Sequence, residues 1–175
     1  VGGAAAISVV TDGPFFGGDE AMLQLVKATV RRPVLQKEFL VEPWQVWHAR
    51  AIGADASLLI AAVLPGGQLA EMLGTAREAG LHILVEIVNE EEYARADAAG
   101  AEVIGVNNRD LRDFSVDLGR TERLMPLYAE HQVAVAESGL KGRAEIERLQ
   151  AAGVDAFLMG EALMLAPDPA AHLRV

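Results

Sequence analysis

The sequence predicts a parallel α/β protein, and three observations point to this class. Seven short runs of aliphatic and β-branched residues are almost continuously apolar, as in strands covered on both faces. Longer amphipathic stretches lie between these runs. Most of the amphipathic stretches end at a glycine, the residue that a left-handed helix C-cap favours. A chain of 175 residues, 51% of them hydrophobic, is also long enough to bury one sizeable core.

The expected elements alternate regularly along the chain. The predicted strands are Ala6–Val10, Val34–Lys37, Ala56–Ala62, Ile83–Ile87, Val103–Asn107, Val133–Glu137 and Ala156–Gly160. The predicted helices are Asp19–Val30, Pro43–Ile52, Gln68–Ala79, Glu90–Ala99 and Gly142–Ala152, and a further one begins at Pro167–Asp168. The glycines expected to end helices are Gly53, Gly80, Gly100 and Gly153. Such short links fit both a closed (β/α)₈ barrel (TIM barrel) and an open doubly wound sheet.

The two ends of the sequence favour the barrel. The chain opens VGGAAAISVV, where Gly2–Gly3 before a strand repeats the pattern that ends the other helices. One further βα unit upstream would give eight strands, the number that closes a barrel. We therefore expect residues 1–175 to form a single (β/α)-barrel domain that contains strands 2–8. This domain would be incomplete at the N-terminus and slightly incomplete at the C-terminus.

Composition excludes several classes of function. The formal net charge of −10 argues against a nucleic-acid partner, because phosphates would be repelled. No apolar run approaches the roughly 18 residues of a membrane span, and no signal peptide is visible. The sequence has no cysteine, and its four histidines show no metal-ligand spacing. We expect a cytoplasmic protein without a metal or a membrane partner.

Polar side chains collect where the predicted strands end. In a parallel barrel, the carboxyl ends of the strands and the loops that follow them carry the chemistry. The ionisable residues at these ends include Asp12, Lys37, Glu38, Glu86, Arg109, Glu137 and Glu161. One such residue could be a solvated loop residue, but their repetition at the same end of successive strands predicts an active site.

Two of these loops suit a phosphate group. Ser138–Gly139 and Gly160–Glu161 follow the last two strands, where barrels often bind phosphate through backbone N–H groups. Glycine allows the backbone to approach an anion closely. We therefore predict that Ser138, Gly139, Gly160 and Glu161 bind phosphate.

The motifs at the strand ends resemble, in order and spacing, those of the indole-3-glycerol phosphate synthase family. They are PVLQKEF, LLIAAVL, LVEI, GVNNRDL, AESGLKGRAEIERL and LMGEALM, preceded by SVVTDGPFFGG. The resemblance implies a TIM barrel that acts as a carboxy-lyase of tryptophan biosynthesis. The family converts 1-(2-carboxyphenylamino)-1-deoxyribulose 5-phosphate into indole-3-glycerol phosphate, carbon dioxide and water, with no metal and no organic cofactor.

The same resemblance implies roles for four catalytic residues. Lys37 matches the general acid that protonates the ketone oxygen of the substrate, a role favoured by apolar walls that destabilise a charged lysine. Glu86 matches the carboxylate assigned to proton transfer in ring closure and dehydration. Asn107 matches a substrate-contacting residue, and Glu137 matches a residue that orients lysine side chains.

Other matches imply a binding pocket. Arg109 would contact the anionic substrate, and the expected apolar wall of the pocket consists of Phe16, Phe39, Leu58 and Leu111. The chain departs from the common arginine-lysine-aspartate version of the third-strand motif, because Gln36 and Glu38 flank Lys37. The first strand of the family, with a glutamate and a second essential lysine, has no counterpart in residues 1–175.

Two alternatives remain open from the sequence. Another phosphate-binding barrel enzyme of tryptophan or histidine biosynthesis would share the late glycine loops. An inactive fragment that self-associates through open strand edges is the second alternative, because unpaired edges are a route to association.

Overall fold

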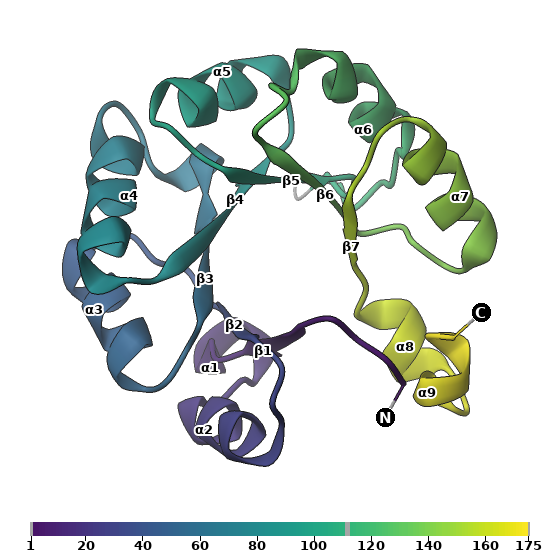
Figure 1. Cartoon of the computed structure of the whole chain (residues 1–175), viewed down its shortest axis with the longest axis horizontal. Coiled ribbons are helices and arrows are strands. Elements are labelled where there is room, and N and C mark those ends of the chain that lie inside the picture. Colours follow the sequence, from purple (N-terminus) through teal and green to yellow (C-terminus); the bar gives the residue numbers. More distant parts are fainter. Residues whose placement is uncertain (1, 111–112, 175) are drawn as a thin grey trace. The chain divides into compact units, whose positions relative to one another are not determined.

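The computed structural model describes residues 2–110 and 113–174 (Figure 1). The chain divides into two compact units. Unit 2 comprises Ala5–Val85 and Arg95–Ala101, and unit 1 comprises Val1–Ala4, Glu86–Ala94 and Glu102–Val175. Strand β4 (His82–Ile87) and helix α5 (Glu90–Ala98) each contribute residues to both units.

Unit 2 contains three paired parallel strands, β1 (Ile7–Val10), β2 (Val34–Lys37) and β3 (Ala56–Ile60). Ile7 pairs with Val34 and Val10 with Lys37, so β1 and β2 end together. The helices of this unit are α1 (Gly13–Phe16), α2 (Glu20–Thr29), α3 (Pro43–Ala51) and α4 (Gln68–Ala79), with a 3₁₀ turn η1 (Ala61–Val63). Figure 1 shows α3 and α4 on the same side of β3.

Unit 1 contains a second set of paired parallel strands, β5 (Val103–Asn107), β6 (Val133–Glu137) and β7 (Ala156–Leu158). Asn107 pairs with Glu137, and Glu137 with Leu158, so the carboxyl ends of all three strands lie at one edge. The remaining elements are α6 (Gly119–Leu124), the 3₁₀ turn η2 (Met125–Leu127), α7 (Arg143–Ala151), α8 (Glu161–Leu165) and α9 (Pro169–His172).

Each unit has its own apolar packing. In unit 2, one face of each of the helices α2, α3 and α4 is buried, and the fully buried side chains include Leu23, Val46, Leu69 and Met72. In unit 1, Ala136 of β6 packs with Leu140, Leu149 of α7 and Val154. The amphipathic helices therefore cover strands that are apolar on both faces, as the sequence pattern requires.

The glycines that follow four helices adopt the predicted left-handed conformation. Gly80 is the C-cap of α4 with φ 65°, and Gly53, Gly100 and Gly153 have φ values of 102°, 76° and 104°. Residues other than glycine have a strained backbone in this region of φ and ψ. These positions confirm the repeated helix, glycine, strand unit.

The structure departs from the sequence prediction at several short elements. The strand expected over Ala56–Ala62 ends at Ile60, because residues 61–63 turn into η1. The strand expected over Ala156–Gly160 ends at Leu158. Helices α1, α6 and α8 were not predicted, since four to six residues are too few for a helical period to stand out.

The parallel α/β class and the seven strands are confirmed. Closure into an eight-stranded barrel and a single-domain organisation stay predictions. Among residues 2–110 and 113–174, no helix is both long and apolar enough to cross a membrane.

Candidate active site

Lys37 is the last residue of β2 and is half-buried. The N–H of Thr11, just after β1, donates to the Lys37 carbonyl oxygen at 3.1 Å. Its neighbour Val10 is the register partner of Lys37 across the parallel pair. The main chain of Lys37 is thus fixed at the point where the two strands end together.

A chain of four hydrogen-bonded side chains crosses the three strands of unit 2 next to Lys37. Ser57 Oγ donates to Gln36 Oε1 at 3.2 Å, and Gln36 Nε2 donates to Thr11 Oγ1 at 3.1 Å. Thr11 Oγ1 then donates to Glu38 Oε2 at 2.8 Å. Ser57, Gln36 and Thr11 are buried. Since buried polar groups need partners, this chain explains why glutamine and glutamate flank the lysine here.

Aromatic rings gather beside this strand end. Asp12 begins α1 by accepting hydrogen bonds from the Phe15 and Phe16 N–H groups at 2.8 and 3.0 Å. The Phe16 and Phe15 rings lie 6.1 and 6.4 Å from the ring of Phe39. The structure thus brings Phe16 and Phe39 together, and it adds Phe15, which sequence reasoning missed. Exposed aromatic faces of this kind suit a flat apolar ligand.

The two remaining predicted pocket residues are Leu58 and Leu111. Leu58 lies within β3 and is 2% exposed. Leu111 lies outside the described residues.

In unit 1, three predicted catalytic residues are buried at the carboxyl ends of strands. Glu86 lies in β4, Asn107 ends β5 and Glu137 ends β6. Asn107 Nδ2 donates to Glu86 Oε1 at 3.0 Å, and Asn107 pairs with Glu137 across the sheet. Glu86 and Glu137 are 3% and 2% exposed. Burying carboxylates costs free energy, so two of them at one strand edge indicate a functional site.

Asn108 ties the loop after β5 to its surroundings. Its side chain is fully buried: Nδ2 donates to the Glu137 carbonyl oxygen at 3.0 Å, and Oδ1 accepts from Thr121 Oγ1 at 2.8 Å. Its carbonyl oxygen accepts from the Asp117 N–H at 2.9 Å. Asn108 therefore joins the end of β6, the start of α6 and the base of the loop.

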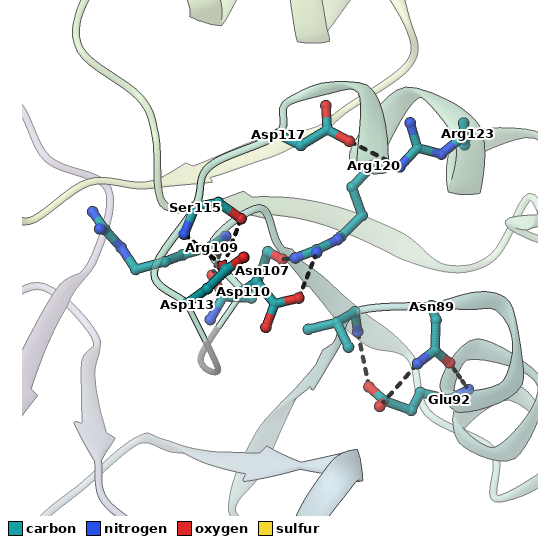
Figure 2. Close-up of polar contacts among 11 residues, drawn as sticks. Asn89, Glu92, Asn107, Arg109, Asp110, Asp113, Ser115, Asp117, Arg120 and Arg123 are labelled. Carbon is teal, nitrogen blue, oxygen red and sulfur yellow. Dashed lines mark hydrogen bonds and ion pairs between the residues drawn. The ribbon is translucent and has the colours of Figure 1, made fainter.

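The loop that starts at Arg109 is held by side chains from α6 (Figure 2). Arg120 Nη1 donates to the Asn107 carbonyl oxygen at 2.7 Å, and its Nη2 lies 3.7 Å from Asp110 Oδ2. At the other end of the loop, Arg123 donates to Asp117 Oδ2 at 2.9 Å. This hydrogen bond, with one from the Gly119 N–H, holds the pKa of Asp117 below its usual range.

The two loops expected to bind phosphate lie at one edge of unit 1, because β6 and β7 are register neighbours. Ser138 and Gly139 both have positive φ, 62° and 73°. A Cβ at Gly139 would lie 2.3 Å from Val116 Cγ1, so only glycine fits under the loop after β5. Ser138 is strained there, as residues at functional sites often are.

Glu161, at the start of α8, was predicted from the sequence to bind phosphate, and in the structure its side chain also forms an ion pair. Its Oε2 accepts a hydrogen bond from Arg109 Nη2 at 2.6 Å. Sequence reasoning missed this pair, and it also missed Asn108 and Arg120. The sequence signal for Asn108 was its position within the strand-end motif GVNNRDL, and the signal for Arg120 was its position at the start of the following helix. No group of three or more potential metal ligands occurs among residues 2–110 and 113–174.

The family-model comparison and two of the most similar relatives point to the same family. The family model described as indole-3-glycerol phosphate synthase matches residues 1–175. A relative from Ralstonia nicotianae, indole-3-glycerol phosphate synthase 2, is 46% identical over 94% of this chain and 62% of its own length. Another with the same name, from Streptomyces coelicolor, is 47% identical over 99% of this chain and 67% of its own length. The chain thus spans about two thirds of the length of these relatives.

Solved structures show a wider likeness in fold. A crystal structure of 3-hexulose-6-phosphate synthase from Salmonella typhimurium matches with a TM-score of 0.80 at 16% identity, over 95% of this chain and 82% of that protein. At a sequence identity this low, the match is evidence for a shared fold and not for a shared function. Because the family model covers the whole sequence, the chain belongs to the indole-3-glycerol phosphate synthase family.

Proposed function

We propose that this chain carries the catalytic strand ends of an indole-3-glycerol phosphate synthase. The substrate would be 1-(2-carboxyphenylamino)-1-deoxyribulose 5-phosphate, and the products indole-3-glycerol phosphate, carbon dioxide and water. The observation that carries the proposal is the position of Lys37, Glu86, Asn107 and Glu137 at or next to the carboxyl ends of four of the strands, β2, β4, β5 and β6. Family membership supports the same reaction.

The first chemical step would form the new carbon–carbon bond. The ring carbon that bears the carboxylate attacks the ketone carbon, while Lys37 gives a proton to the ketone oxygen, which becomes a hydroxyl group. A positioned general acid typically accelerates such a step by about 10²–10⁴-fold. Carbon dioxide then leaves, and the electron pair of the broken bond returns to the ring.

The second stage would remove water. The hydroxyl group leaves as water with a proton from the neighbouring CH2 carbon, the one bound to the nitrogen, and this creates the carbon–carbon double bond of the indole ring. Glu86 is the proposed proton carrier for this stage. The hydrogen bond from Asn107 Nδ2 at 3.0 Å orients its carboxylate, and burial keeps water from competing for that proton.

Binding would depend on local features, since the chain is acidic overall. The aromatic rings of Phe16 and Phe39 are the proposed wall for the anthranilate ring. Arg109 and the loops Ser138–Gly139 and Gly160–Glu161 are the proposed anion contacts. A local positive focus can attract an anion in spite of the global charge.

An eight-stranded (β/α)₈ barrel is the architecture that we propose for these strands, and Lys37 and Glu86 are proposed to serve the same reaction. The test is a double-mutant cycle. If both residues serve one reaction, Lys37→Met and Glu86→Gln together should cost less than the product of the two separate losses in kcat. Fully multiplicative losses would argue against a role of both residues in the same reaction.

The activity itself is tested in a chimera in which residues 1–175 replace the matching segment of the Streptomyces coelicolor relative, assayed beside the 175-residue chain alone. We expect the chimera to form indole-3-glycerol phosphate, measured by its ultraviolet absorbance. A chimera that is folded and monodisperse, yet inactive while the parent relative turns over, would contradict the proposal.

A further inference from the structure

The Arg109–Glu161 ion pair joins two loops of unit 1 that sequence analysis had assigned separately to binding the substrate. Arg109 follows β5 and Glu161 follows β7, and β6 pairs with both strands. The pair therefore reaches across β6, which ends at Glu137 and is followed by Ser138–Gly139. Figure 2 shows the Arg109 side chain extending away from the group formed by Asn107, Asp110 and Arg120.

The guanidinium group of Arg109 is already engaged by protein oxygens. Nη2 donates to Glu161 Oε2 at 2.6 Å, and Nη1 lies 3.5 Å from the Phe114 carbonyl oxygen. The Arg109 side chain is 29% exposed, whereas that of Glu161 is 69% exposed. A substrate anion that approaches Arg109 must therefore compete with a carboxylate.

The two partners are not equally free to move. The Arg109 main chain is fixed by the N–H bond to Asn107 Oδ1 at 3.0 Å and by the bridge to Val116. Glu161 is the first residue of a five-residue helix, and its mostly exposed side chain can turn into water. Displacement of Glu161 therefore breaks its own hydrogen bond to Arg109 and leaves the bonds that hold the Arg109 main chain intact.

We propose that Glu161 is an internal counterion of Arg109, which the anionic group of the substrate displaces, so that Glu161 lowers the affinity of the site for anions. The inference rests on the proposed role of Arg109 in substrate binding. In this role, the Glu161 carboxylate competes with the substrate anion for the Arg109 guanidinium group. The glycine loop, in contrast, would contact the anion through its backbone.

The expected effect is moderate. A ligand that binds only the open form has its apparent affinity reduced by the fraction of the protein that is open. Partly exposed ion pairs are of modest strength, so we expect Glu161 to weaken anion binding by about fivefold. The anion could be a phosphate or a carboxylate, since the substrate carries both.

Anion binding to the 175-residue chain can be measured by calorimetry with two probes, inorganic phosphate and anthranilate. Glu161→Gln should lower the Kd of at least one probe by about fivefold, and the responding probe identifies the chemical source. Arg109→Gln should weaken binding of the same probe. Glu147→Gln is the matched control, because it breaks another exposed ion pair, to Arg143 at 2.6 Å on α7. Its Kd should stay at the wild-type value.

A second variant separates contact from general charge repulsion. Glu161→Asp keeps the negative charge but shortens the side chain by one methylene group, so it should bind the anion almost as tightly as Glu161→Gln. The proposal is overturned if Glu161→Asp behaves as wild type, if Glu161→Gln changes nothing, if Arg109→Gln still binds normally, or if no variant binds either probe. Turnover by the chimera is a separate readout, so failure of the proposed reaction would not be confused with failure of the counterion.

Discussion

The two ends of the strands are built on opposite plans. At the amino ends, the same arrangement occurs twice. The Asp55 N–H donates to the Val34 carbonyl oxygen at 2.9 Å, and its Oδ2 accepts from the Val34 N–H at 2.8 Å. In unit 1, Asp155 makes the same two bonds with Ala134, at 3.0 and 2.8 Å. In both places the aspartate follows a helix-ending glycine by two residues.

No such repetition occurs at the carboxyl ends that we have described. In unit 2, the strand ends share a hydrogen-bonded chain that finishes at Glu38. In unit 1, they carry the Glu86–Asn107 pair and the fully buried Asn108. Repeated geometry at one end holds neighbouring strands together, whereas unlike side chains at the other end are what a specific reaction requires.

The largest expected effect is at the carboxyl end of β2. Lys37→Met in the chimera should lower kcat by at least about a hundredfold, the usual scale for loss of a general acid, with a much smaller change in substrate affinity. Lys27→Met is the matched control, because Lys27 pairs with Asp55 at the amino end, at 2.7 Å. That control should lose stability and keep its turnover. A Lys37→Met variant within a few-fold of the parent kcat would contradict the assignment.

Asn108→Ala should affect both stability and turnover. It removes two buried hydrogen bonds and leaves the Thr121 hydroxyl without that acceptor, which should cost about 2–4 kcal/mol. Because Asn108 also holds the end of β6, kcat should fall as well. Urea unfolding measures the first effect and single-turnover kinetics the second. Unchanged kcat in a destabilised variant would place Asn108 with the purely structural residues.

Asp155→Ala should lower the stability of the fold and leave kcat unchanged. It leaves the buried Ala134 N–H without the carboxylate acceptor, a loss of about 1–2 kcal/mol. Substrate turnover at a temperature where the variant remains folded should match the parent. Urea unfolding midpoints and kcat, measured side by side, make the comparison. A fall in kcat would show that the amino ends are not limited to holding the fold.

The smallest expected effect is the pH dependence of the contribution that Asp55 makes to the free energy of unfolding. Burial raises the pKa of Asp55, but the hydrogen bonds from Lys27 and from the Val34 N–H outweigh it, so the pKa lies below its ordinary value of 3.8. A depressed folded-state pKa stabilises the protein above the unfolded-state pKa, and this stabilisation is lost as the pH falls through the folded-state value. Wild type should therefore exceed Asp55→Asn in stability at pH 7, by no more than about 1 kcal/mol since both side chains are partly exposed. The difference should shrink below about pH 4 in urea titrations. A difference that grows as the pH falls would contradict this sign.

The strands could be predicted from the sequence because they are buried on both faces. Continuous apolar runs bounded by glycine leave little choice of element, and all seven lie where expected to within a few residues. Short helices such as α1 and α6 could not be predicted. Their few residues are fixed by caps and loops, for example by the Asp12 carboxylate, and not by a periodic pattern.

Several residues of the candidate site could be proposed from the sequence, whereas the contacts between them could not. Lys37, Glu86 and Asn107 stood out because they are polar residues at the end of apolar runs. The link between Arg109 and Glu161 joins positions 52 residues apart, and no local pattern signals it. Likewise, the role of Gln36 depends on Ser57 in β3 and on Thr11 just after β1.

Hydrogen exchange with and without indole-3-glycerol phosphate tests most directly whether the carboxyl ends hold the ligand. The backbone amides of Ser138–Gly139 and Gly160–Glu161 should exchange more slowly with the ligand present, because backbone donors would hold its phosphate. Amides at the amino ends, such as those of Val34 and Ala134, should be unaffected. Protection confined to the loop that contains Phe16, or protection of the amino ends alone, would contradict the account.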